Sequence, residues 1–358
     1  MKRLWKLLFL LLDLRIIFVA ESKDLRKDRS TLSPFGSRRT IVGGNVADPQ
    51  RYPYFVRLEY SGYLGCGGTL VWPDLVLTAA HCAYDEDVDP QSMVALVGEK
   101  ERRTIRRVIP HPAYDDPTNQ YDVAVLKLNE PILGVPLVAL AQSDHLATLQ
   151  QTSSSDTVNV TVIGFGATAD DSRNSNVLRE AHIQIVSDET CQKFYNRGDI
   201  HGPSMLCAAH AEEWQGPCYR DSGGPLLFLG NTQLEIEANK TLTTTARTVN
   251  ETLGRDLQLG IISWGGERCA DPNQPGVYAD VAHVQPWVER VICRYGLEPP
   301  VDCENEFSLT DDINDDWGTA YDDGEWTVDQ SQAFFKSQRK QNIQLGILFL
   351  CSTLVHLL

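Results

Sequence analysis

The chain has 358 residues, of which 42% are hydrophobic and 22% charged, as expected for a globular protein of one to three domains. Its 48 acidic residues outnumber its 32 basic ones, giving a net charge of −16. Phosphate binding needs the opposite balance, so a general nucleic-acid binder is excluded. No internal run of 18 or more apolar residues occurs, which excludes a multipass membrane protein. Nine cysteines favour an oxidising, extracellular setting.

The N-terminus has the pattern of a secretory signal peptide. Basic residues lie at its start, residues 7–12 are all apolar, and Ala20 is a small residue suited to cleavage. We therefore expect residues 1–20 to be a signal peptide and residues 21–40 a propeptide. An uncleaved anchor or an incorrect gene start would leave the same pattern, and both alternatives stay open.

The C-terminal part is acidic and then apolar. Residues 297–340 are expected to form an acidic linker or disordered tail, because residues 302–329 contain many acidic side chains and no Lys or Arg. Residues 311–316 resemble a calcium loop, but Trp317 stands where the sharp turn needs glycine. The apolar residues 341–358 are either an end without an anchoring role or the signal for a glycolipid anchor at the outer cell surface.

Short strands between turn residues dominate the middle of the chain. Alternating apolar residues predict strands over residues 158–163 and 257–263, and residues 123–128 form a third candidate. Near the end the period becomes that of a helix. Its apolar face comprises Val284, Trp287, Val288, Val291 and Ile292, with Pro286 near the first turn and Gly296 as the stop. Many strands with one terminal helix predict an all-β barrel or sandwich.

Three short segments carry the residue types that nucleophilic catalysis needs. They are Thr78-Ala79-Ala80-His81-Cys82, Tyr121-Asp122-Val123-Ala124-Val125 and Asp221-Ser222-Gly223-Gly224-Pro225-Leu226. Each alone is modest evidence, since a lone histidine, aspartate or glycine-flanked serine is more often structural. A serine hydroxyl is a poor nucleophile at neutral pH, however, and needs a base such as histidine within hydrogen-bond reach.

Together, in the order His, Asp, Ser, these segments resemble the trypsin/chymotrypsin family of serine proteases. Further matching motifs are Ile41-Val42-Gly43-Gly44, Cys66-Gly67-Gly68, Ser263-Trp264-Gly265 and Pro275-Gly276-Val277-Tyr278. The resemblance covers about residues 41–296 and implies two six-stranded antiparallel β-barrels, a C-terminal α-helix and an active site in the cleft between the barrels. It implies no cofactor and no metal. The expected partners are protein or peptide substrates and protease inhibitors.

The resemblance assigns a role to each catalytic residue. His81 is the general base, Asp122 fixes its tautomer, and Ser222 attacks the peptide carbonyl. The backbone amides of Arg220 and Ser222 form the oxyanion hole, while Ser263 supports Asp122. These roles predict a secreted serine endopeptidase that works through an acyl-enzyme and is made as a zymogen.

Two departures from the family pattern favour an alternative, a catalytically silent homologue that binds a partner or inhibits through the same cleft. Arg220 stands where the family has glycine, and it could turn the amide donor away. In the family, cleavage frees an N-terminus such as Ile41, whose ammonium pairs with an aspartate, here Asp221. The preceding residue is usually basic, but here it is Thr40. Either an activator cuts after Thr40, or Thr40 is trimmed, or the pair never forms.

The primary specificity pocket is expected to be neutral. Trypsin-like members carry an acid at its base, where this chain has Gly216, and Gly265 and Gly276 leave the walls open. Ser263 and Trp264 complete the expected substrate-binding residues. An open neutral slot suits an apolar or aromatic side chain rather than Lys or Arg.

The resemblance also selects cysteine pairs that the sequence alone leaves open. It implies the disulfides Cys66–Cys82, Cys191–Cys207 and Cys218–Cys269. Cys293 and Cys303 remain, and we expect them to pair although the family does not require it; Cys351 is left over. A zinc site is not favoured, since no C-x-x-C pair occurs.

Three sequons for N-glycosylation begin at Asn159, Asn239 and Asn250. The last two lie in an insertion at about residues 230–256, where the family has a tight hairpin. We expect a surface loop there. It either modulates access to the cleft or is a passive excursion.

Overall fold

The computed structural model describes residues 41–83, 92–98, 100–152, 157–167, 174–230, 255–300 and 303. The predictions for the signal peptide, the propeptide and the apolar end lie outside these residues, as do the sequons at Asn239 and Asn250 and the acidic tail apart from residues 297–300 and 303. Within the described part, none of the helices has the length and apolar character needed to cross a membrane.

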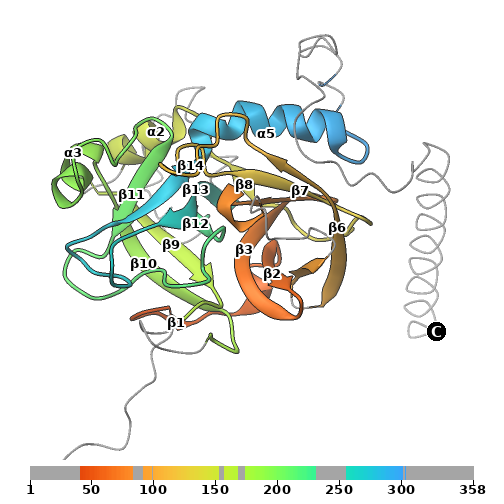
Figure 1. Cartoon of the computed structure of the whole chain (residues 1–358), viewed down its shortest axis with the longest axis horizontal. Helices are drawn as coiled ribbons and strands as arrows, with labels where there is room; N and C mark the ends of the chain where they lie inside the picture. Colours follow the sequence, from red (N-terminus) through yellow and green to blue (C-terminus); the bar gives the residue numbers. More distant parts are fainter. Residues whose placement is uncertain are drawn as a thin grey trace, which may run out of the picture. The chain divides into compact units, whose positions relative to one another are not determined.

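The first β-barrel closes through six strands in the order β2–β3–β4–β7–β6–β5 (Figure 1). These are β2 (Phe55–Tyr60), β3 (Tyr63–Trp72), β4 (Leu75–Thr78), β5 (Met93–Val97), β6 (Glu101–Pro110) and β7 (Ala124–Leu128). Every neighbouring pair is antiparallel. Two single-turn 3-10 helices flank it, η1 (Pro49–Arg51) and η2 (Ala80–Cys82). Strand β7 confirms the prediction for residues 123–128. Its sequence is mostly apolar because nearly all of the strand is buried.

The second barrel closes in the order β9–β10–β11–β14–β13–β12, with β12 returning to β9. Its strands are β9 (Asn159–Gly164), β10 (Arg179–Val186), β11 (Met205–Ala209), β12 (Pro225–Phe228), β13 (Leu257–Trp264) and β14 (Gly276–Asp280). Two short strands extend it, β1 (Asn45–Val46) beside β10 and β8 (Ala139–Leu140) beside β13. The two closed barrels confirm the predicted all-β fold.

Besides η1 and η2, the described helices are α2 (His145–Thr152), α3 (Asp188–Cys191), η4 (Gln192–Phe194) and α5 (Val281–Tyr295). Helix α5 confirms the predicted terminal helix, and its five predicted apolar residues are buried. It begins earlier than the apolar period suggests, because Asp280 accepts hydrogen bonds from the amides of Ala282 and His283 and caps it. Pro286 consequently lies inside the helix rather than near its first turn.

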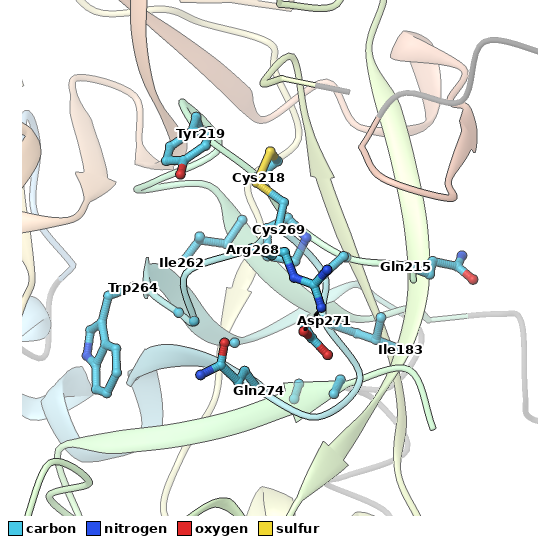
Figure 2. A pocket seen from close by; sticks show the side chains of 18 of the residues that line it. Ile183, Gln215, Cys218, Tyr219, Ile262, Trp264, Arg268, Cys269, Asp271 and Gln274 are labelled. Atoms are coloured by element: carbon cyan, nitrogen blue, oxygen red, sulfur yellow. Dashed lines mark hydrogen bonds and ion pairs between the residues drawn. A yellow bond between two sulfur atoms is a disulfide. The ribbon is translucent and has the colours of Figure 1, made fainter. Parts of the chain in front are cut away.

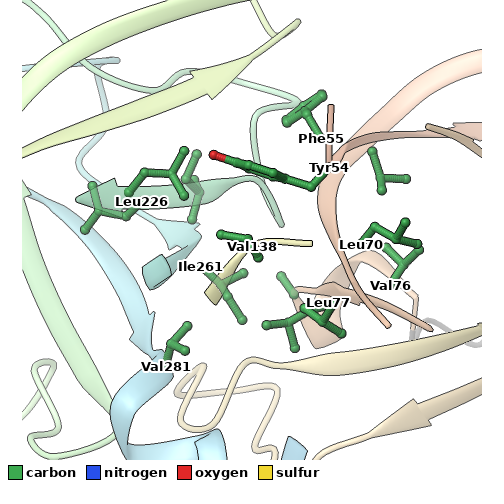
Figure 3. Close-up of a cluster of buried hydrophobic side chains, with 14 of the residues drawn as sticks. Tyr54, Phe55, Leu70, Val76, Leu77, Val138, Leu226, Ile261 and Val281 are labelled. Carbon is green, nitrogen blue, oxygen red and sulfur yellow. The ribbon is translucent and has the colours of Figure 1, made fainter. Parts of the chain in front are cut away.

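A continuous hydrophobic core joins the two barrels. Figure 3 shows Leu70 and Leu77 of the first barrel in the same cluster as Leu226 and Ile261 of the second, and all four are fully buried. Burying one such side chain stabilises the fold by about 1.5–3 kcal/mol. Since the active-site residues come from both barrels, this shared core fixes the geometry of the site.

Four disulfides stabilise the described structure. They link Cys66 to Cys82, Cys191 to Cys207, Cys218 to Cys269, and Cys293 to Cys303. The first three are the pairs that the resemblance implies, and the fourth is the expected additional pair. Native disulfides of this kind typically contribute about 2–5 kcal/mol in secreted domains.

Candidate active site

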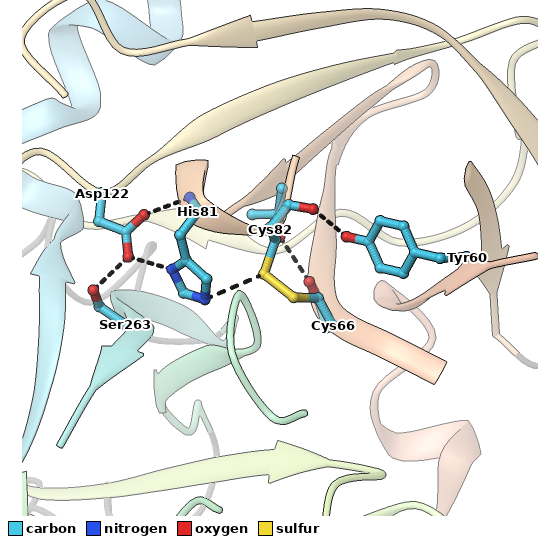
Figure 4. The surroundings of a disulfide bond; sticks show 8 residues. Tyr60, Cys66, His81, Cys82, Asp122 and Ser263 are labelled. Carbon is cyan, nitrogen blue, oxygen red and sulfur yellow. Dashed lines mark hydrogen bonds and ion pairs between the residues drawn. A yellow bond between two sulfur atoms is a disulfide. The ribbon is translucent and has the colours of Figure 1, made fainter. Parts of the chain in front are cut away.

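His81 and Asp122 are brought together by strand pairing in the first barrel. Strand β4 pairs with β7 so that Thr78 lies opposite Ala124. His81 follows β4 and Asp122 precedes β7, so the two meet although 41 positions separate them. The His81 Nδ1 atom lies 2.7 Å from Asp122 Oδ2, and the His81 backbone amide donates to Asp122 Oδ1 at 2.9 Å (Figure 4).

The second barrel contributes a further donor to the same carboxylate. The hydroxyl of Ser263, on β13, donates to Asp122 Oδ2 (Figure 4). Asp122 is fully buried, and a buried carboxylate is tolerated when its oxygens accept hydrogen bonds. With the Asp122 carboxylate as the acceptor, His81 carries its proton on Nδ1, and Nε2 can accept another proton.

The basicity of His81 is set by two opposing effects. Burial lowers the pKa of this histidine. The hydrogen bond and the negative charge of Asp122, with a further contribution from Asp116, outweigh burial and raise the pKa above its ordinary value. The imidazolium that forms when His81 takes a proton is therefore stabilised where a general base requires it.

Ser222 is anchored to the first barrel beside His81. Its carbonyl accepts a hydrogen bond of 2.7 Å from the Gly67 amide. The neighbour of Gly67 is Cys66, whose disulfide partner Cys82 directly follows His81. The serine loop thus lies against the disulfide that borders the imidazole.

The turn after Ser222 fits tightly against the same strands. Gly223 has a φ of +78°, and a Cβ atom there would lie 2.2 Å from Thr78 Oγ1 and 2.5 Å from the Gly67 carbonyl. Only glycine combines this backbone conformation with this close approach. The turn holds Ser222 at the edge of the cleft.

The hydrogen bond between base and nucleophile is not formed. Among the described residues, Ser222 Oγ has no hydrogen-bond partner, and His81 Nε2 lies 3.7 Å from the sulfur of Cys82 (Figure 4). Catalytic hydrogen bonds are often long or misaligned until substrate binds. The structure therefore joins His81 and Ser263 to Asp122 by hydrogen bonds and attaches the Ser222 backbone to Gly67, with no hydrogen bond between His81 and Ser222.

Cys66, His81 and Cys82 are grouped closely enough to suggest metal ligands. Metals bind cysteine as a thiolate, however, and both sulfur atoms are joined in a disulfide. The grouping follows from the disulfide beside the catalytic histidine and is not a metal site.

The predicted oxyanion donors flank Asp221. Arg220 has a φ of +70°, a conformation that favours glycine and costs another residue about 1–2 kcal/mol. Across the described part of the chain, the amides of Arg220 and Ser222 donate to no other residue. Both N–H groups thus remain available to a developing oxyanion.

Asp221 occupies a buried socket that the sequence analysis did not foresee. Its carboxylate accepts hydrogen bonds from the amides of Gly166, at 2.8 Å, and Cys218, at 2.9 Å. A Cβ atom on Gly164 or Gly166 would lie within 2.6 Å of the carboxylate, so these two glycines create its space. The Gly164-Phe165-Gly166 segment is the sequence signal for this socket, but in sequence it resembles an ordinary turn.

The Asp221 carboxylate has no cationic partner among the described residues. Burial raises its pKa to about 7, although the two amide hydrogen bonds act in the opposite direction. Burial therefore makes the protonated form of Asp221 more stable than it would be in an exposed aspartate.

The segment that begins with Ile41 is already packed into the second barrel. The Ile41 side chain is fully buried. The Gly216 amide donates to the Val42 carbonyl at 3.1 Å, and Arg179 Nη2 donates to the Gly44 carbonyl at 2.6 Å. Val42 thereby ties the predicted activation segment to the predicted base of the specificity pocket.

Ser222 is among the residues that line a cavity of about 270 Å³. Figure 2 shows other side chains of this lining, including Tyr219 and Trp264. Its lining includes every predicted substrate-binding residue, namely Gly216, Ser263, Trp264, Gly265 and Gly276. The structure adds an ion pair in which Arg268 Nη2 lies 3.2 Å from Asp271 Oδ2 (Figure 2). Arg268 also stacks over the ring of Trp214, 4.4 Å from its centroid. The two charges on this wall balance one another, so the cavity has no net charge from them.

Comparison with known proteins matches this geometry. The family described as Trypsin matches residues 41–288. The chain is 33% identical to trypsin of Saccharopolyspora erythraea over 67% of this chain and 93% of that protein. It is 32% identical to trypsin iota of Drosophila melanogaster over 69% of this chain and 86% of that protein.

A third relative is longer than this chain's matched region. Transmembrane protease serine 11E of Mus musculus is 30% identical over 74% of this chain, and the match spans only 56% of the mouse protein. The similarity thus covers the peptidase domain and little more than half of that relative. On the family match and these relatives, the chain belongs to the trypsin family of serine endopeptidases.

Proposed function

We propose that this chain hydrolyses peptide bonds through an acyl-enzyme formed on Ser222. The observation that carries the proposal is the bonded His81–Asp122–Ser263 set, with Ser222 held against the neighbouring disulfide by the Gly67 amide. His81 Nε2 takes the proton of Ser222 as the hydroxyl oxygen attacks the carbonyl carbon. The same proton then passes to the leaving amine, and a water molecule repeats the sequence to release the acid.

The amides of Arg220 and Ser222 are proposed to bind the oxygen that becomes negative during attack. Their lack of another acceptor among the described residues supports this role. Losing one such donor typically costs about 3–4 kcal/mol of transition-state stabilisation.

The chain is further proposed to be a secreted zymogen whose peptidase domain spans residues 41–296. Four disulfides support an oxidising compartment. Asn159 is exposed, in keeping with a glycosylation site. The burial of Ile41 supports activation by release of the Ile41 amine, as does the lack of a cationic partner for Asp221 among the described residues.

A fluorophosphonate probe tests the proposed chemistry directly. We expect covalent labelling after cleavage of the Thr40–Ile41 bond, because the probe reacts with an activated serine. Labelling should vanish in Ser222→Ala. A correctly folded, cleaved chain that stays unlabelled would instead be a binding protein without catalysis.

The cavity beside Ser222 is proposed to accept an apolar or aromatic side chain. Gly216 brings no charge, and Arg268 is neutralised by Asp271. Peptides with Phe or Leu before the scissile bond should be cleaved about tenfold or more faster than matched peptides with Arg, because burying an unpaired guanidinium is costly. Measuring kcat/KM on such a panel checks this, and faster cleavage after Arg would contradict it.

A further inference from the structure

Arg220 carries two groups that concern the substrate. Its amide is a proposed oxyanion donor, and its side chain is a cation. Its side chain is exposed, and Nη1 donates to the side-chain oxygen of Asn174 at 2.9 Å. Asn174 lies in the β-bridge with Ala167, just beyond strand β9. This hydrogen bond directs the guanidinium toward Asn174.

This direction lies away from the primary cavity. Tyr219 and Ser222 line the cavity, whereas Arg220 and Asn174 do not. If the cavity takes the residue before the scissile bond, the chain after that bond must leave across the other side of Ser222. Arg220 and Asn174 lie outside the cavity lining, and we infer that they face this departing part of the substrate.

The guanidinium keeps its positive charge available. An amide oxygen is neutral and occupies one of the five N–H donors of an arginine. Within the described residues, Arg220 forms no ion pair with a carboxylate. Arginine binds carboxylates through two parallel hydrogen bonds, so an acidic substrate side chain is its natural partner.

We propose that Arg220, positioned by Asn174, forms a carboxylate-binding subsite that favours Asp or Glu at the first or second position after the scissile bond. This inference rests on the proposed peptidase activity. It would also explain why a residue with a side chain occupies a position whose backbone conformation favours glycine.

Matched pairs of internally quenched peptides test the subsite. Each pair carries the residue that the cavity prefers before the scissile bond and differs only by Asp against Asn, or Glu against Gln, at the first or second following position. We expect the acidic member to show about a three- to tenfold higher kcat/KM at one of these positions, because a partly exposed ion pair is of modest strength. The preference should fall as ionic strength rises.

Two substitutions separate charge from backbone effects. Arg220→Gln removes the charge but keeps a long side chain in the left-handed conformation, and Arg220→Gly removes both charge and strain. Both should abolish the acidic preference. Arg102→Gln, which removes an exposed cation from β6, is the net-charge control and should retain it.

The outcomes are distinct. Cleavage by the wild-type chain without acidic preference, or a preference that survives Arg220→Gln, overturns the subsite and leaves the peptidase activity standing. If the processed wild-type chain cleaves none of the peptides and takes up no fluorophosphonate, the proposed function and this subsite both fail.

Discussion

Replacing Ser222 with alanine is expected to lower kcat by about five orders of magnitude or more while leaving KM close to its original value. The hydroxyl is the atom that forms the covalent bond, so its loss removes the acyl-enzyme route and leaves only binding and oxyanion stabilisation. The cavity that binds the substrate side chain is otherwise intact. Single-turnover and steady-state kinetics on a preferred peptide measure the effect.

His81→Ala should lower kcat to a similar extent, because nucleophile and base act as a unit. The double variant should be little worse than either single one. Asp122→Asn should cost about ten thousandfold, since an amide at that position supports the wrong tautomer of His81. Independent, additive losses or near-normal turnover of any of these variants would contradict the proposed triad.

Folding of these variants needs its own check. Asp122 is fully buried and accepts three hydrogen bonds, so its replacement also tests stability. Ser222 makes no side-chain hydrogen bond among the described residues, and its alanine variant should unfold at a similar temperature to the parent. Thermal unfolding followed by circular dichroism distinguishes lost chemistry from lost structure.

The strand pattern predicted an all-β fold, because the strands are short, apolar and separated by turn residues, but it left a barrel and a sandwich open. The prediction of His81, Asp122 and Ser222 as the catalytic residues came from the family resemblance, since each local segment alone is modest evidence. Long-range strand pairing, such as Thr78 opposite Ala124, was supplied by the family resemblance and not by any periodicity. Helix α5 could be predicted from its apolar face alone, because its buried residues repeat at helical spacing.

Features that depend on distant residues could not be predicted in the same way. The socket of Asp221 requires Gly164 and Gly166, which lie more than fifty positions away and look like an ordinary turn in sequence. The balanced pair of Arg268 and Asp271 depends on how a loop folds over the cavity. Likewise, no local pattern reveals that Arg220 keeps a φ of +70° and reaches Asn174.

Cleavage of the Thr40–Ile41 bond is expected to raise activity by at least about a hundredfold over a chain that begins at Thr40. The new ammonium on Ile41 can pair with the buried Asp221 carboxylate, which otherwise has no cationic partner among the described residues. One extra residue would move the ammonium out of reach of the socket. The test compares two otherwise identical chains in which an engineered site for a specific activating protease leaves either Ile41 or Thr40 as the first residue.

The same ion pair should reverse the pH dependence of stability that Asp221 produces. In the intact chain its pKa is raised to about 7, against about 3.9 for an aspartate in an unfolded chain. The folded state therefore holds the proton more tightly, and the resulting stability is complete below about pH 4 and is lost as pH rises through about 7. The loss amounts to roughly 4 kcal/mol at most.

Urea unfolding of the intact chain between pH 4 and pH 8 measures this loss, with Asp221→Asn as the control. The asparagine amide does not titrate, so the difference in stability between the two proteins isolates the contribution of Asp221. Two other groups titrate in this range: burial raises the pKa of Asp280 to about 6 and lowers the pKa of His111 to about 4. After cleavage, the Ile41 ammonium should keep the Asp221 carboxylate ionised, and stability should no longer fall through this range. If the Asp221-dependent stability of the cleaved chain still declines toward pH 7, the ion pair does not form. Equal activity of the chains that begin at Ile41 and at Thr40 would independently show the same.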